Sequence, residues 1–215
     1  MDQQENASGK SQPTQADGGT REKILSAALA EFAQHGLAGA RVDRIAERAG
    51  INKAMIYYHF SSKAALHKEI VDEYFSQILP RVRQAFSGST KLEDALATFA
   101  AVYAREFSTS PEFRLIFLRE LADAESEMID RIAETIVASG LPKQIVNSFE
   151  AGIEQGRFRP VDIRQVFVSF ILMNVGYFVL APLIDKIWDV TDRDQFIAER
   201  KEAVIDLFLH GVKTQ

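Results

Sequence analysis

Residues 53–63 carry side chains that can bind both the backbone and the bases of a nucleic acid. The polar members of this group are Lys53, Tyr57, Tyr58, His59 and Lys63. Ammonium and phenol groups donate hydrogen bonds to phosphate oxygens, and a lysine can also reach the acceptor atoms of guanine. Ala54 and Met55 beside them offer apolar contacts to a thymine methyl group. These residue types predict a surface that contacts DNA.

The neighbouring residues predict how this surface is positioned. An apolar stripe at positions 45, 46 and 49 predicts a helix over residues 42–49, and Gly50 permits the left-handed backbone that ends it. Asn52 is a strong N-cap for a second helix over residues 53–59. In that helix Ile56 points inward, which leaves the DNA-binding candidates on the outer face. The layout is a helix-turn-helix.

This stretch resembles the DNA-binding domain of the TetR family of one-component repressors. The family pattern reads roughly A-x-x-x-F-x-x-x-G, then I-A-x-x-A-G-V-S-x-x-x-L-Y-Y-H-F-x-x-K-x-x-L, and the match runs from Thr20 to Leu66. The matching residues are Ala28, Phe32, Gly36, Ile45, Ala46, Ala49, Gly50, Ile51, Asn52, Ile56, Tyr57, Tyr58, His59, Phe60, Lys63 and Leu66. The resemblance implies a three-helix head that binds an operator.

Two positions depart from the family pattern. Asn52 replaces the commoner Ser, and it caps a helix equally well. Arg41 stands where the family often has Thr at the start of the second helix. This change removes a side-chain cap, but Arg41 can instead contact a phosphate, so we count it among the DNA-binding candidates.

The aromatic residues of the second helix have an alternative role. Tyr57, Tyr58 and His59 could pack inside a small three-helix head, and this alternative is substantial for Tyr58, which could brace the helix. For Tyr57 and Lys63 we favour phosphate contacts, because a phenol and an ammonium beside a helix N-terminus suit an anion. Lys53, at the start of the recognition helix, is placed to meet base edges.

Composition limits the class of protein. The chain has 215 residues, 47% of them hydrophobic, and it contains no cysteine, which excludes disulfides and thiolate metal sites. We find no signal peptide and expect a cytoplasmic protein. The net charge is −5, but residues 20–63 alone carry +3. A basic head on an acidic body predicts that only one end of the protein meets phosphates.

The pattern along the chain predicts an all-α protein, because no segment alternates like a strand. Residues 1–19 are polar and predict a disordered tail. Residues 20–66 form the helix-turn-helix domain, in which Thr20 caps a helix to His35 that Gly36 ends. Residues 67–215 form a helical body for ligand binding and dimerisation, entered by a helix from Lys63 that Pro80 kinks or interrupts.

The most apolar part of the body lies near its end. A helix over residues 162–184 is just long enough to span a membrane. However, Asn174, Gly176 and Pro182 and the lack of a basic flank favour a buried helix and no membrane contact. A helix that is apolar all round needs cover on every side. This helix and a second one over residues 192–212 predict a homodimer, in which two helices from each chain form a four-helix bundle.

Aromatic and polar residues gather in the body and predict an effector cavity next to the helix from Lys63. The candidates are Tyr74, Tyr103, Phe107, Phe117, Asn147, Phe149, Asn174 and Tyr177. Buried polar groups need partners, and a mainly apolar ligand with one or two polar groups would supply them. Hydrogen bonds within the protein are an alternative that is at least as good for each polar residue.

We expect no enzyme, cofactor or metal site, because the four histidines form no i, i+4 pair and the chain has no nucleophile elbow or phosphate-cradling glycine loop. The sequence predicts a homodimeric DNA-binding regulator. The resemblance to the TetR family implies a repressor that a small hydrophobic effector releases from a palindromic operator in double-stranded DNA. The alternative is a dimeric small-molecule-binding or scaffold protein whose head reads no specific sequence. A membrane-anchored protein is the weakest of the three hypotheses.

Overall fold

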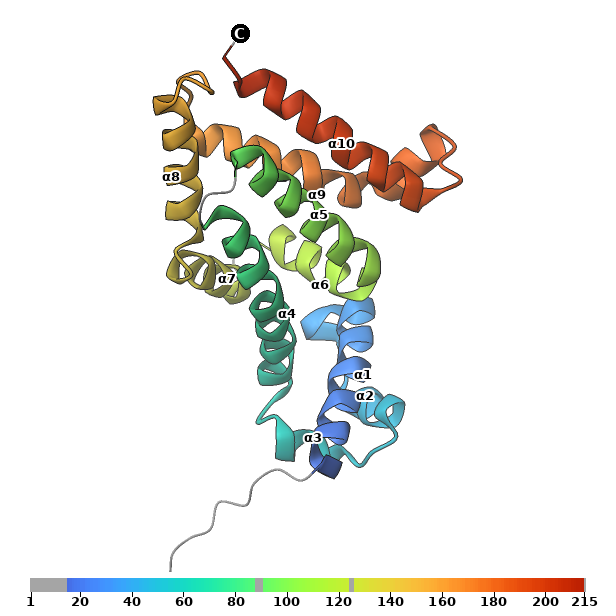
Figure 1. Cartoon of the computed structure of the whole chain (residues 1–215). Helices are drawn as coiled ribbons and strands as arrows, with labels where there is room; N and C mark the ends of the chain where they lie inside the picture. Colours follow the sequence, from blue (N-terminus) through green and yellow to red (C-terminus); the bar gives the residue numbers. More distant parts are fainter. Residues whose placement is uncertain (1–14, 88–90, 124–125, 215) are drawn as a thin grey trace, which may run out of the picture. The chain divides into compact units, whose positions relative to one another are not determined.

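The computed structural model describes residues 15–87, 91–123 and 126–214, and these contain ten α-helices and no strand (Figure 1). The only β pairing among them is an isolated bridge between Phe158 and Lys213. The all-α prediction is therefore confirmed. The chain divides into two compact units, Met1–Ile70 and Val71–Gln215, here called the head and the body.

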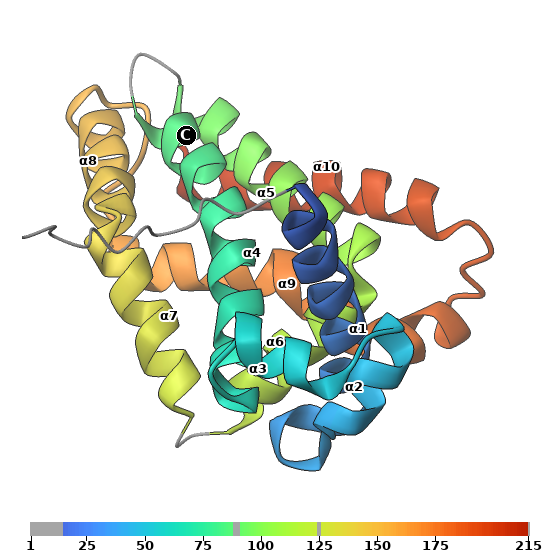
Figure 2. The same ribbon diagram turned by 90° about the horizontal axis from the view of Figure 1, so that it is seen from below.

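The head contains α1 (Gln15–Gly39), α2 (Val42–Ala49), α3 (Lys53–His59) and the start of α4 (Lys63–Phe86). Helix α2 contacts both α1 and α3, as Figures 1 and 2 show. The inner faces supply a core of aliphatic and aromatic side chains, all nearly inaccessible to solvent: Ile24, Ala28, Phe32, Ile45, Ile56, Phe60 and Leu66. This core fixes α3 with its opposite face in solvent.

The start of α1 differs from the prediction. Residues 1–14 of the predicted tail lie outside the described residues, but residues 15–19 are helical, so Thr20 lies inside α1 and does not cap it. Extending an existing helix gains one hydrogen bond for each residue fixed, which favours such an added turn. The break at Gly36 is confirmed by its φ of 66°, although a short helical segment follows to Gly39.

Helix α4 runs from the head into the body. The Ser62 hydroxyl accepts a hydrogen bond from the Ala65 N–H (3.0 Å), as expected for a cap. The helix continues through Pro80 to Phe86, so the predicted interruption is wrong. In the body, side chains tie α4 to its neighbours: Asp72 accepts two hydrogen bonds from Arg131 (2.9 and 2.8 Å).

The other body helices are α5 (Leu92–Thr109), α6 (Pro111–Ala122), α7 (Glu127–Ala138), α8 (Leu141–Glu154), α9 (Ile163–Ile187) and α10 (Arg193–Val212). The last two agree within a few residues with the helices predicted over residues 162–184 and 192–212. Helix α5 contacts α6, α8, α9 and α10, and α10 also runs along α9. Helix α5 is therefore the central helix of the body, and α7 contacts α6 and α8.

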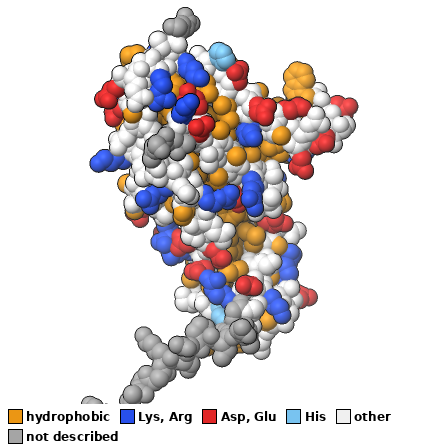
Figure 3. All heavy atoms as spheres, viewed as in Figure 1, with side chains coloured by type: hydrophobic (Ala, Val, Ile, Leu, Met, Phe, Trp, Pro, Cys, Tyr) orange, Lys and Arg blue, Asp and Glu red, His pale blue; other side chains and the backbone are white. Residues whose placement is uncertain are grey.

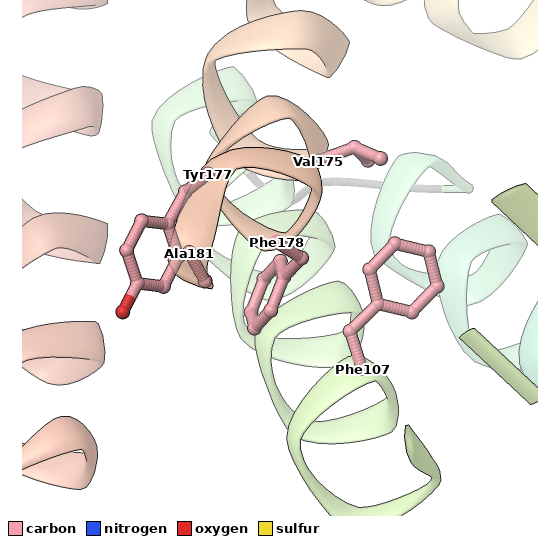
Figure 4. Packing of buried hydrophobic residues seen from close by; sticks show 5 residues of the cluster. All are labelled: Phe107, Val175, Tyr177, Phe178 and Ala181. Atoms are coloured by element: carbon pink, nitrogen blue, oxygen red, sulfur yellow. The ribbon is translucent and has the colours of Figure 1, made fainter. Parts of the chain in front are cut away.

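The junction of α5 and α9 is a core of large side chains (Figure 4). It consists of Phe107, Val175, Tyr177, Phe178 and Ala181, with the rings of Phe107 and Phe178 edge to face at 5.4 Å. Tyr177 points to the other side of α9, where its ring lies 5.4 Å from that of Phe196 on α10. This core therefore fixes α9 between α5 and α10.

Helix α9 is only half covered by its own chain. One face is buried, but the other exposes six large apolar side chains: Val168, Leu172, Val179, Leu180, Leu183 and Ile187. On α10, Leu207 is likewise 64% exposed. Figure 3 shows one face of the surface, with apolar side chains among the charged ones. By length and composition alone α9 could also cross a membrane.

Candidate nucleic-acid interface

Helix α3 is short and depends on its cap and on one buried residue. The Asn52 side chain accepts a hydrogen bond from the Ala54 N–H (2.9 Å), which satisfies one of the free donors at the helix start. Ile56 is buried beneath the helix. Lys53, Ala54 and Tyr57 are therefore exposed on the opposite face, as the sequence predicted.

The start of α2 is fixed by a residue that we did not predict from the sequence. Arg41, at the N-cap, makes no side-chain cap. Instead Glu31 of α1, only 1% exposed, accepts hydrogen bonds from the Arg41 N–H (3.0 Å) and from Arg44 Nε (2.7 Å). A distant carboxylate thus replaces the missing threonine cap.

The charge of Glu31 is stabilised by these partners. Burial by itself raises the pKa of the carboxyl, but the hydrogen bonds from the Arg41 N–H and Arg44 outweigh it, so the pKa of Glu31 lies below its ordinary value. His35 Nε2 lies 3.8 Å from the other carboxylate oxygen. Glu31 therefore stays ionised at neutral pH and holds α1 and α2 together.

An open hollow of about 600 Å³ lies between the start of α2, α3 and the start of α4. Four cationic side chains line it, with one acid and one phenol: Arg41, Arg44, Lys53, Lys63, Asp43 and Tyr57. These charges sum to +3. A concave surface with this excess attracts anions, and phosphate groups are the anions that DNA presents.

The cations of this hollow differ in how they are held. Lys53 Nζ lies 2.7 Å from Asp43 Oδ1, and this hydrogen bond raises the pKa of Lys53. Lys63 donates to the carbonyl oxygens of Ala38 (3.2 Å) and Ala40 (3.0 Å). Because an ammonium has three donors, Lys63 retains one for a phosphate while it ties α4 to the end of α1.

The tyrosines of α3 face solvent. Tyr58 is 73% exposed, which disfavours the alternative in which it packs inside the head, and Tyr57 is about half exposed. The ring of His59 is partly buried and meets that of Tyr58 edge to face at 5.2 Å. Met55 is also partly buried. The exposed members of the predicted set are therefore Arg41, Lys53, Ala54, Tyr57 and Tyr58.

Two residues of this interface escaped sequence analysis, Glu31 and Arg44. A signal was present for Glu31, because an acid directly before Phe32 lies on a helix face that is otherwise apolar. Arg44 is half exposed and also donates to the Gly39 carbonyl (3.1 Å). Its role depends on its contact with Glu31, which lies thirteen residues away in the sequence. No local sequence pattern reveals this contact.

Known proteins share both the head sequence and the fold. Residues 24–70 match the family model described as bacterial regulatory proteins, tetR family. The uncharacterised HTH-type transcriptional regulator YdeS of Bacillus subtilis is 36% identical over 168 residues, covering 76% of this chain and 80% of YdeS. The chain belongs to the tetR family.

Two other members extend the likeness across the body. The HTH-type transcriptional regulator RutR of Escherichia coli is 25% identical over 198 residues, which is 90% of either chain. The crystal structure of FadR from Bacillus subtilis in complex with stearoyl-CoA has a TM-score of 0.69 at 18% identity and covers 88% of this chain and 98% of FadR. This tetR-family chain therefore has the family fold in the body as well as in the head.

The predicted effector residues lie in different surroundings in the body. Tyr103 stacks on Phe99 (4.4 Å) and Phe107 lies 5.9 Å from Phe117, so these rings form one aromatic cluster. Tyr74 stacks on Phe113, and its hydroxyl donates to the Glu106 carbonyl (3.1 Å). Burial raises the pKa of both Tyr74 and Tyr103 to about 12, so both hydroxyls stay protonated.

Of the other four candidates, Tyr177 belongs to the same core as Phe107, whereas Asn147 and Phe149 on α8 have other neighbours. Asn147 is exposed on α8, and Phe149 packs against Phe158 and Phe208, so their part in an effector site stays a prediction. Helical spacing placed them on one apolar segment, but it could not show which side of α8 the neighbours cover. Asn174 and Tyr177 line a pocket together between α5, α9 and α10.

Among the described residues no group of His, Asp or Glu side chains has the arrangement of a metal site. The tetR family consists of bacterial transcriptional regulators. The cations and hydrogen-bond donors that line the hollow of the head suit an anionic partner.

Proposed function

We propose that this transcriptional regulator is a cytoplasmic repressor that binds a palindromic operator as a homodimer and leaves it when a small, mainly apolar effector binds the body. The observation that carries the proposal is the cationic hollow beside α3, where Arg41, Lys53 and Lys63 surround Tyr57. Backbone contacts from these residues would position α3 so that Lys53, Ala54 and Met55 meet base edges in the major groove.

The exposed apolar face of α9 supports the homodimer. Six large side chains of α9 and Leu207 of α10 form an apolar surface that a second copy would cover. Gly176 lies on this helix with open space beside it, which permits close approach of another helix. In the DNA-bound dimer the two α3 helices would be about one turn of DNA apart, roughly 34–36 Å.

An effector can act only through a preference for one spacing of the two heads over another. Helix α4 connects head and body in a single element, and the Asp72–Arg131 ion pair fixes it to α7 within the body. An effector that rearranges α5 to α7 would therefore move α4. The bound stearoyl-CoA in the FadR structure supports an apolar effector for this fold.

The test is a DNA mobility-shift assay with the full-length protein and the DNA upstream of its own gene. We expect a retarded complex that unlabelled random DNA does not compete away at equal concentration. Tyr57→Phe should weaken binding to every sequence alike, since the phenol would contact the backbone. Lys91→Ala, which removes an exposed cation from the body, is the matched control and should leave binding unchanged.

The alternative function, a scaffold or ligand-binding dimer without specific DNA readout, makes a different prediction. In that case random DNA would compete as well as the upstream fragment, and Lys53→Ala would not change the preference among operator variants. Equal competition would therefore overturn the operator-binding proposal, while leaving the dimer intact.

A further inference from the structure

A small pocket between α5, α9 and α10 has a polar lining that the proposed function does not explain. Its volume is about 20 Å³, enough for one or two groups of the size of a water molecule. The wall combines two cations, two other polar residues and small apolar ones: Arg200, Lys201, Asn174, Tyr177, Ala100 and Ala104. None of its lining residues is an acid.

Arg200 lines this pocket and does not use all of its hydrogen-bond donors. Its Nη2 donates to the Met173 carbonyl (2.8 Å), and its guanidinium carbon lies 5.5 Å from the centre of the Tyr177 ring. Its Nε is buried and has no hydrogen-bonding partner among the described residues. A guanidinium has five N–H donors in a planar fork, and a buried donor without an acceptor is unfavourable.

The nearby carboxylates are engaged elsewhere. Asp185 accepts hydrogen bonds from the Tyr177 hydroxyl (3.0 Å) and from Arg193 Nε (3.0 Å), and the hydrogen bond from Arg193 lowers the pKa of Asp185. Glu199 is exposed and accepts from Gln195 (2.8 Å). Neither Arg200 nor Lys201 forms an ion pair within the described part of the chain.

We propose that this pocket binds the carboxylate of a small organic acid. Arg200 would donate from its guanidinium and Lys201 would add a second positive charge, while the apolar part of the acid would extend out of the open side of the pocket. The two oxygens of a carboxylate match a pocket for one or two water-sized groups and the planar fork of Arg200, whereas a phosphate with four oxygens is larger and would leave acceptors unmatched.

The site would connect an effector to the dimer surface. Arg200 and Leu207 belong to the same helix, α10, and α9 on the other wall exposes the proposed dimer face. This inference rests on the proposed function for the consequence of binding, because an acid that moves α10 would alter the spacing of the two heads. The binding itself is independent of DNA and can be measured without it.

The experiment follows the Arg200 Nε–H signal of the full-length protein by NMR during titration with butyrate. Butyramide, of the same length but uncharged, is the matched ligand control. We expect butyrate to shift this signal with saturation, and butyramide to leave it unchanged at the same concentrations. Similar shifts with both ligands, or a shift with inorganic phosphate but none with butyrate, would overturn the proposal.

Two variants test the residues. Arg200→Gln should weaken butyrate binding by roughly tenfold or more, because it removes a charge-assisted hydrogen bond from a buried site. Arg105→Gln, an exposed arginine of α5, should leave it unchanged. If Arg200→Gln does not fold, Arg200→Lys keeps the charge and should still weaken binding. Unchanged butyrate affinity in a folded Arg200 variant would overturn the assignment.

A separate assay distinguishes this inference from the proposed function. Butyrate is added to the complex of the protein with its upstream DNA. Release of the DNA supports both proposals together. Butyrate binding without release supports the anion site and overturns its role in sensing. Absence of butyrate binding overturns the site, whether or not the protein binds its operator. The same outcome is expected if a carboxylate of a second copy of the chain already pairs with Arg200.

Discussion

The head and the body differ in whether a buried charged side chain finds its hydrogen-bond partners within the protein. In the head, the buried Glu31 accepts hydrogen bonds from the Arg41 N–H and from Arg44, all within the same unit. In the body, Arg200 retains a buried Nε donor without a partner in the described residues. The head satisfies its own buried charge, whereas the body retains a buried donor that the proposed ligand would satisfy.

The apolar surfaces differ in the same way. The exposed large apolar side chains of the described head are Tyr57 and Tyr58, whose hydroxyls suit a polar partner. Helix α9 instead exposes aliphatic side chains such as Leu172, at 63% of its surface. The head therefore presents groups that bind a hydrated, charged surface, and the body presents groups that another apolar surface would cover.

The largest expected effect concerns the apolar surface of the body. Leu183→Asp places a charge in the proposed dimer interface, where an unpaired carboxylate costs roughly 3–5 kcal/mol. Analytical ultracentrifugation should therefore show a dimer dissociation constant raised by roughly a hundredfold or more. The control is Leu115→Asp on α6, because Leu115 is also exposed (46%) but lies outside α9 and α10. Equal dissociation constants for the two variants would place the dimer interface elsewhere.

The second prediction tests the self-sufficiency of the head. Glu31→Gln removes the negative charge that accepts hydrogen bonds from Arg44 and from the Arg41 N–H. The substitution should lower the free energy of unfolding by about 2 kcal/mol. Chemical denaturation measures this change. Glu22→Gln, on the exposed side of the same helix, is the control and should change stability little. No difference between the two variants would mean that Glu31 does not hold α2.

The pH dependence sharpens the same prediction. The folded pKa of Glu31 lies below the ordinary value of 4.5, so its contribution is present above that value and is lost as the pH falls through the folded pKa. Between neutral pH and about pH 5 the contribution should be constant. The Glu31→Gln variant should therefore lose less stability than the wild type when both are acidified below pH 4.5.

The third prediction separates two cations of the hollow. Arg41→Ala and Lys63→Ala should each reduce the salt dependence of DNA binding by about one unit of slope, since each is expected to contact one phosphate. Only Lys63→Ala should also destabilise the head, because Lys63 bonds the carbonyls of Ala38 and Ala40. An unchanged slope for either variant would remove that residue from the DNA interface.

The smallest expected effect concerns the acid in the hollow. Asp43→Asn removes the partner of Lys53 and a negative charge that repels phosphate. DNA affinity should rise, by no more than roughly fivefold, because an exposed ion pair is weak and screened by salt. Fluorescence anisotropy at low and high salt measures it. Weaker binding by the variant would show that Asp43 is needed to orient Lys53.

The sequence by itself determined the elements of the head and their order. Local rules were enough there: the cap at Asn52, the left-handed Gly50 and the buried Ile56 are each set by residues within one turn. The pattern of apolar residues also located α9 and α10 in the body, because burial of apolar side chains repeats along a helix. The sequence pattern did not predict the start of α1 or the passage of α4 through Pro80, since extension of a helix depends on the turns already formed.

Only the tertiary structure decided which distant side chains meet. No pattern links Glu31 to Arg44, or Arg200 to the Tyr177 ring, because these contacts depend on how two helices pack and on the direction of each side chain. For the same reason the sequence could not show that Asn147 is exposed and that Phe149 packs against Phe208. Helical spacing identifies an apolar face, whereas its neighbours are chosen by the packing of the whole unit.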